Sequence, residues 1–176
     1  MSSSYALLGI LDKQPSYGYD LKRIYDRYFG SEKPLAFAQV YSTLARLQGH
    51  GEIVSTAIEK DGGPERKRYA ITQSGKDDLA AWLVRPEGLS PKSQSILFTK
   101  VVTAILVDKS PNDYLDAQRR VHLQRMRELT KMRREENLAQ ALQADLALFH
   151  LEADLRWIDI TSARLESLVK ELSHAQ

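Results

Sequence analysis

Polar and aromatic side chains lie along one side of a short segment, residues 36–48, whose other side is apolar. Val40, Leu44 and Leu47 recur at spacings of four and three residues, which predicts a helix with one buried face. The positions away from that face hold Phe37, Gln39, Tyr41, Ser42 and Arg46. Side chains of these types can bond to base edges and phosphates, so the segment is suited to the major groove of duplex DNA.

The chemistry of each of these five side chains suggests a role on DNA. Gln39 and Ser42 can hydrogen-bond base edges, and Phe37 can touch the methyl group of a thymine. Tyr41 can reach a phosphate. Arg46 lies further along the helix, where a contact with the DNA backbone is expected in place of base reading.

A predicted β-hairpin follows this helix. Residues 52–60 and 66–72 alternate and are rich in β-branched types, and residues 61–65 form a glycine-rich turn between them. Basic side chains that could contact phosphates lie in the second strand and in the loop before the helix: Arg66, Lys67, Arg68 and Lys33. Alternation sends Lys67 to the opposite face from the two arginines, so these charges could also serve solubility alone.

The elements of the first half of the chain have the order of a winged helix-turn-helix. An apolar helix covers residues 5–11, and Ser16 is a suitable N-cap for a second helix over residues 17–29. The third helix, the hairpin and a fourth helix from Ser74 complete the order. Tyr17 and Tyr19, at the start of the second helix, are further candidates for contact with DNA.

Two prolines and a glycine in residues 85–92 interrupt the helical patterns on both sides and divide the chain. Beyond the break, one helix is expected near residues 94–107. Ser110 and Pro111 then form a strong start for another helix, which is expected to run to about Asp145.

The last helix carries apolar residues at alternating spacings of four and three over three heptads, the pattern of a coiled-coil seam. The residues of this seam that are expected at a dimer interface are Leu151, Leu155, Ile158, Leu165, Val169 and Leu172. The predicted fold is therefore mostly α. A winged helix-turn-helix with a two-stranded wing, residues 1–85, is followed by a coiled-coil-like helical hairpin for dimerisation, residues 86–176.

Aromatic side chains offer a candidate pocket for a small aromatic ligand between the two predicted domains, formed by Trp157, Phe98 and Phe149. Each of these could instead belong to the core or to the dimer interface. The basic stretch over residues 119–134 has a similar ambiguity, because glutamates are interleaved with its arginines and lysines. These residues could contact phosphates, but we expect them to form the solvent-exposed surface of a helix.

No catalytic, metal-binding or cofactor-binding pattern is found in the sequence. The four histidines, His50, His122, His150 and His174, have no metal-ligand spacing, and His122 and His150 are expected on helix surfaces. The chain has no cysteine, which excludes disulfides and thiolate chemistry. It also lacks a signal-peptide pattern and an apolar run long enough for a membrane span, so a cytoplasmic protein with no membrane contact is expected.

The charge balance says little about partners by itself. The net charge is only +2, and basic and acidic residues are nearly balanced in both halves of the chain. Affinity for DNA would have to come from local patches.

The segments SYGYDLKRIYDRYFG, AQVYSTLARLQGHGEI and RKRYAITQSGKDDLAAWL together resemble the PadR family of transcriptional regulators. The matching features are the Gly18-Tyr19 pair, the Val-Tyr-x-Thr-Leu-x-x-Leu pattern of residues 40–47, and the Tyr-x-Ile-Thr-x-x-Gly pattern of residues 69–75. Ala38-Gln39 and Ser42 depart from the family pattern of Gly-Ser before and proline after Val-Tyr, so an operator sequence does not transfer.

The resemblance implies a homodimeric repressor that binds a near-palindromic operator and is released by a small molecule, for which phenolic acids are the founding example. A winged-helix module that binds a protein partner is the alternative, because a fold does not dictate its function. Affinity for duplex DNA that falls steeply with salt would favour the DNA-binding hypothesis.

Overall fold

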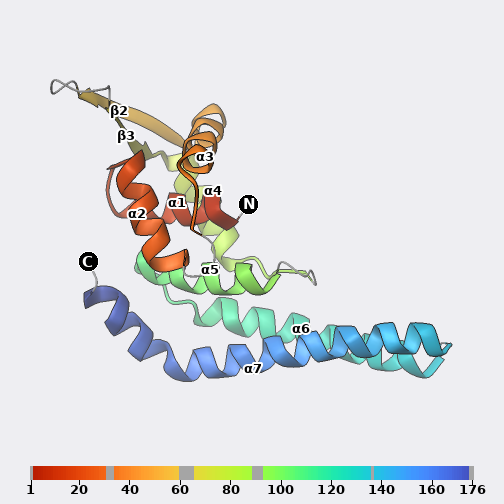
Figure 1. The fold of residues 1–176 in the computed structure, drawn as a ribbon. Coiled ribbons are helices and arrows are strands. Elements are labelled where there is room, and N and C mark those ends of the chain that lie inside the picture. The colour runs from red at the N-terminus through yellow and green to blue at the C-terminus, as the bar shows by residue number, and fades with distance from the viewer. Residues whose placement is uncertain (1, 31–33, 60–65, 89–92, 136, 175–176) are drawn as a thin grey trace. The chain divides into compact units, whose positions relative to one another are not determined.

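The computed structural model describes residues 2–30, 34–59, 66–88, 93–135 and 137–174. Its elements, in chain order, are α1 (Ser2–Lys13), β1 (Ser16–Tyr17), α2 (Gly18–Phe29), α3 (Phe37–Gly49), β2 (Ile53–Glu59), β3 (Arg66–Ile71), α4 (Gln73–Val84), α5 (Ser93–Leu106), α6 (Asn112–Glu135) and α7 (Leu138–His174) (Figure 1). The mostly helical fold with an N-terminal winged helix and a C-terminal helical hairpin is thereby confirmed.

The chain forms two compact units. The first comprises residues 1–85 and 95–110, and the second comprises residues 86–94 and 111–176. The first unit therefore includes α5 in addition to the winged helix. The close approach of α1 and α5 explains this grouping, because a Cβ atom on Gly9 would lie only 2.6 Å from Cγ2 of Thr103.

The sheet of the first unit is antiparallel and has three strands in the order β1–β3–β2. Ser16 pairs with Tyr69 at one edge, and Ile53 pairs with Ile71 on the other side of β3. The expected N-cap role of Ser16 is wrong, because Ser16 belongs to β1 and its hydroxyl donates to the carbonyl of Gln14 at 3.1 Å. Pairing with β3 extends the chain here and delays the start of α2 to Gly18.

One apolar core holds the winged helix together. It collects buried leucines from α1, α2, α3 and α4 together with aromatic and β-strand residues, among them Leu7, Leu21, Leu44, Ile53 and Trp82. The apolar face predicted for α3 is confirmed, since Val40, Leu44 and Leu47 are all exposed by 1% or less.

A buried lysine joins α5 to the end of α4. Lys100 is fully buried, donates to the carbonyl of Arg85 and holds its ammonium 4.9 Å above the ring of Trp82. Trp82 in turn stacks on Tyr5 at 4.4 Å. Burying an ammonium is costly unless hydrogen bonds and aromatic faces compensate it, and both are present here.

The second unit contains α6 and α7, which run side by side as an antiparallel hairpin (Figure 1). The expectation that the first of these helices continues to about Asp145 is wrong, because α6 ends at Glu135 and α7 begins at Leu138. Asn137 explains the boundary. Its side-chain oxygen accepts from the amide of Gln140 at 3.1 Å, an N-cap that starts a new helix.

The expected surface position of His122 is also wrong. Its side chain is 1% exposed and lies between α6 and α7, with Nε2 3.3 Å from a carboxylate oxygen of Asp154. Nδ1 is 3.2 Å from the amide of Gln118, which also bonds to the backbone N–H and carbonyl of Glu87. His150 is exposed, as expected.

Membrane-spanning helices and metal-binding clusters are both absent from the described residues. None of the described helices combines the length and the apolar character that crossing a bilayer requires. The same residues contain no group of three or more histidines and acidic side chains placed to hold a metal ion.

Candidate nucleic-acid interface

The first turn of α3 presents aromatic surface to solvent. Phe37 is 45% exposed and Tyr41 is 49% exposed, whereas Val40 between them is fully buried. The core therefore fixes the orientation of the helix, and the two rings lie on its outward face.

Gln39 has two tasks at this end of α3. Its side-chain oxygen accepts from the backbone N–H of Ala36 at 3.1 Å, and its own N–H donates to the carbonyl of Ala36 at 3.0 Å. Because alanine has no polar side chain, this cap uses the side chain of Gln39 alone. The amide NH₂ of Gln39 is the group suited to donate to a base.

The hydroxyls of the next turn bond locally. Ser42 and Thr43 both donate to the carbonyl of Gln39, at 3.1 and 2.7 Å. Ser42 is exposed, and its oxygen can still accept a hydrogen bond from a base or a bridging water.

The position of Tyr41 depends on a glycine of α2. A Cβ atom on Gly18 would lie 2.7 Å from Cε1 of the Tyr41 ring and 3.1 Å from its hydroxyl oxygen. The ring thus packs directly on the backbone at the start of α2. Tyr69 of β3 is close enough to Tyr41 for an electrostatic effect, and burial raises the pKa of Tyr69 above its usual value.

A stacked aromatic pair lies beside Tyr41. The rings of Tyr19 and Phe37 are 5.8 Å apart and nearly parallel, and Lys22 places its ammonium 5.0 Å from the centre of the Phe37 ring. Lys22 also pairs with Asp26, whose other oxygen accepts from the N–H of Leu35 at 3.0 Å. Sequence reasoning missed Lys22, although its place one turn after Tyr19 could have revealed it.

The wing contributes basic side chains from β3. Lys67 is exposed, and Arg68 donates from Nε to the carbonyl of Pro15 at 3.2 Å while lying 5.9 Å from the ring of Tyr17. Arg66 begins β3, but its side chain lies outside the described residues, as does all of Lys33.

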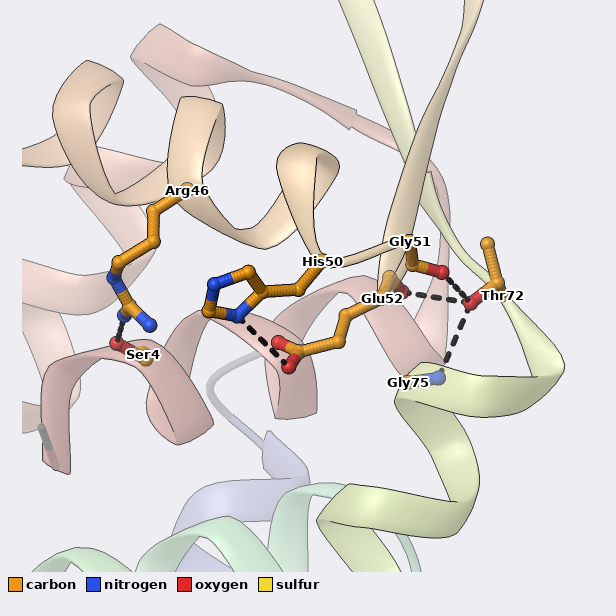
Figure 2. A network of polar contacts seen from close by, with 7 residues as sticks. All are labelled: Ser4, Arg46, His50, Gly51, Glu52, Thr72 and Gly75. Carbon is orange, nitrogen blue, oxygen red and sulfur yellow. Dashed lines mark hydrogen bonds and ion pairs between the residues drawn. The ribbon is translucent and has the colours of Figure 1, made fainter.

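Arg46 has an intramolecular partner. Its guanidinium donates to the hydroxyl of Ser4 in α1, so this side chain ties the second half of α3 to the first helix (Figure 2). A contact between Arg46 and the DNA backbone remains a prediction.

Three arginines in the basic stretch of α6 pair with carboxylates. Arg119 pairs with Asp116 at 2.6 Å and with Asp159 of α7 at 2.8 Å. Arg125 pairs with Glu128, and Arg133 pairs with Asp145. These pairs agree with the expected reading of this stretch as a solvated helix surface.

The proposed ligand-contacting aromatics belong to both units. Phe98 lies on α5 in the first unit and is 42% exposed. Phe149 and Trp157 lie on α7 in the second unit, where Phe149 is 65% exposed and Trp157 is half-buried.

The seam residues of α7 have unequal burial within a single chain. Leu151 and Ile158 are fully buried and Leu165 is 9% exposed, while Leu155 and Leu172 are half-buried and Val169 is 39% exposed. Leu151 packs with Leu129 of α6 and with neighbouring residues of its own helix. Much of the seam is therefore used inside the hairpin.

These features define a winged helix-turn-helix of the kind found in DNA-binding regulators, with an aromatic and polar edge on its third helix. Residues 7–81, from within α1 to within α4, match the model of the transcriptional regulator PadR-like family. The similarity to that family is confined to this part, which is less than half of the chain.

Two relatives are named as transcriptional regulators, not as enzymes. The chain is 36% identical over 91 residues to the probable transcriptional regulator Rv1176c of Mycobacterium tuberculosis, covering 52% of this chain and 47% of that protein. It is 33% identical over 81 residues to the negative transcriptional regulator PadR of Bacillus subtilis, covering 46% of this chain and 44% of that protein. The chain thus spans less than half the length of either relative in these matches.

Among solved structures, the chain is similar to Bacillus subtilis PadR in complex with operator DNA. The TM-score is 0.46 at 20% identity, and the match covers 89% of this chain and 95% of that one.

Proposed function

We propose that this protein is a sequence-specific DNA-binding regulator of transcription that reads its operator with α3 and contacts phosphates with the β2–β3 wing. The observation that carries the proposal is the half-exposed Phe37 and Tyr41 edge of a helix whose opposite face is locked in the core. The winged-helix docking mode places such an edge in the major groove. Lys67 and Arg68 on the wing supply cations for phosphates.

We propose that the regulator acts as a homodimer and that two copies meet along α7. Besides the seam, this helix has a second apolar stripe, which we call the outer face: Leu138, Leu142, Leu146, Phe149 and Ile160. Its members recur at spacings of four, four, three and eleven residues, so they share one side of the helix. Each is at least 45% exposed within one chain.

A second copy of this chain is the partner that fits the outer face. A twofold axis lets one apolar stripe bury itself against an identical stripe, so no other surface is required. From Leu138 to Ile160 the outer face covers more than half the length of α7 on one side of the helix. Two copies joined in this way would present two α3 helices to a near-palindromic site.

We further propose repression in the cytoplasm, relieved by a small aromatic effector. Repression is supported by the name of the Bacillus subtilis relative, a negative transcriptional regulator. An aromatic effector is supported by the half-buried ring of Trp157 on α7. A phenolic acid is the first ligand to test.

The test of DNA reading is the double variant Gln39→Ala with Tyr41→Ala. The variant removes the side chain of Gln39, which is directed at a base, and that of Tyr41, which is directed at a phosphate. A good base contact contributes about one to three kcal/mol, so we expect operator affinity to fall by about a hundredfold or more. Fluorescence anisotropy with labelled operator measures the loss. The control is Gln48→Ala, an exposed position at the other end of α3.

The salt dependence of binding separates DNA from a protein partner. The proposal requires affinity for duplex DNA to fall steeply with rising salt, because phosphate contacts release counterions. Wild-type affinity in the double variant, or no salt-dependent binding of any duplex, would refute the assigned reading edge.

A further inference from the structure

A single hydroxyl joins three elements at the base of the wing. Oγ1 of Thr72 donates to the carbonyl of Gly51 at 2.7 Å, with the carbonyl of Glu52 at 3.0 Å as a second acceptor (Figure 2). The same oxygen accepts from the backbone N–H of Gly75 at 3.1 Å, which caps α4. One side chain therefore connects the turn after α3 with the start of α4.

Thr72 also lies where both strands of the wing are anchored. β3 ends at Ile71, directly before Thr72, and β2 begins at Ile53, directly after Glu52. The backbone N–H of Thr72 donates to the carbonyl of Glu52 at 3.0 Å. The direction in which the wing leaves the domain is thus set at this point.

The local backbone leaves little room for another arrangement. Gly51 has a φ of +73°, a conformation that favours glycine and turns the chain sharply from α3 into β2. A Cβ atom on Gly75 would lie 2.2 Å from the carbonyl oxygen of Glu52. The start of α4 is therefore pressed against the turn that follows the reading helix.

Two further contacts lie near the end of α3. Arg46 donates to Ser4 of α1, and His50 lies 3.7 Å from a carboxylate oxygen of Glu52 (Figure 2). With α3 tied to α1 through Arg46, the Thr72 hydroxyl adds a side-chain link between the end of α3 and the wing.

We propose that Thr72 is a positioning residue for DNA recognition, whose hydroxyl fixes the angle between α3 and the wing so that both fit one operator. The inference rests on the proposed function. A reading helix and a wing that move independently can still attract phosphates, but they lose the joint fit that a specific site requires.

The test compares Thr72→Val, which keeps the shape and removes the hydroxyl, with Thr72→Ser, which keeps the hydroxyl. We expect Thr72→Val to lower affinity for the operator by about tenfold, in line with the loss of a capping bond. Affinity for a scrambled duplex should change less than about twofold, and Thr72→Ser should stay within about twofold of the wild type on both duplexes.

The matched control is Thr99→Val on α5, which removes a buried hydroxyl that donates to the carbonyl of Ser95 at 2.7 Å, far from the wing in sequence. It should leave the ratio of operator to scrambled affinity unchanged. Undiminished operator affinity in Thr72→Val, equal losses on both duplexes, or an equal change in Thr99→Val would each overturn the positioning role. If the wild type itself selects no duplex, the proposed function fails first.

Discussion

At the scale of single residues, the site depends on a close contact between Gly18 and Tyr41. Gly18→Ala would place a methyl group 2.7 Å from the Tyr41 ring, so the ring must move from its place beside α2. We expect operator affinity to fall by about tenfold, with a loss of stability of about 1 to 3 kcal/mol from overpacking. Fluorescence anisotropy and urea unfolding measure the two effects.

Gly49→Ala is the control for that substitution. Gly49 lies at the end of α3, and a Cβ atom there would meet no atom within 4 Å. The variant should therefore bind the operator as the wild type does. If Gly18→Ala also binds normally, the Tyr41 ring has no required position.

The buried pair of His122 and Asp154 predicts a pH dependence of stability. Burial lowers the pKa of His122 below the usual histidine value of 6.5, although Asp154 opposes this effect. The unfolded chain then binds more protons than the folded chain between the lowered pKa and 6.5. The free energy of unfolding should accordingly fall as the pH drops below about 6.5.

Urea unfolding of His122→Gln across this pH range checks the prediction. The variant should lack the part of the decrease that His122 causes, whereas His150→Gln, at an exposed position of α7, should retain it. If the free energy of unfolding changes with pH in the same way for the wild type and for His122→Gln, then His122 binds its proton equally well in the folded and the unfolded chain, and the prediction is wrong.

At the scale of elements, the boundary between α6 and α7 depends on one capping residue. Asn137→Ala removes the acceptor for the N–H of Gln140 and should cost about 1 kcal/mol in the free energy of unfolding. Asn137→Asp keeps an acceptor and should stay close to the wild type. Unchanged stability in Asn137→Ala would mean that the boundary has another cause.

The sequence predicts well those elements that have a regular spacing of apolar residues or a strong turn signal. The apolar spacing of Val40, Leu44 and Leu47 was enough to orient α3, because each of these side chains enters the core. The glycine-rich turn between two alternating segments likewise predicted the wing strands. Both signals are local, so no knowledge of distant partners was needed.

The features that the sequence did not predict depend on contacts between distant residues. Ser16 has the chemistry of an N-cap, but pairing with Tyr69 makes it part of a strand. His122 lies in an arginine-rich stretch of the sequence, and only the approach of Asp154 shows why it can be buried. Lys22 acquires its place in the site through the ring of Phe37.

At the scale of the whole molecule, the two apolar stripes of α7 predict different results for two double variants. Leu142→Asp with Phe149→Asp changes outer-face residues that are 59% and 65% exposed, so it should give folded monomers. Leu155→Asp with Leu165→Asp changes the seam, and Leu165 is already buried within one chain. This second variant should unfold the hairpin of α6 and α7, because buried carboxylates are costly.

Sedimentation velocity and circular dichroism distinguish these results. A dimer that persists in the outer-face variant, together with folded monomers in the seam variant, would place the contact between copies at the seam. Loss of helical signal in the outer-face variant would instead show that this stripe packs within the chain.

Selection of duplexes from a random-sequence pool tests the central claim most directly. The account predicts enrichment of an inverted repeat whose half-sites are one turn of DNA apart, about 34 Å, or a multiple of that distance. It also predicts that this enrichment disappears in Gln39→Ala with Tyr41→Ala. A wild-type protein that enriches no sequence, or a double variant that enriches the same repeat, would contradict the account.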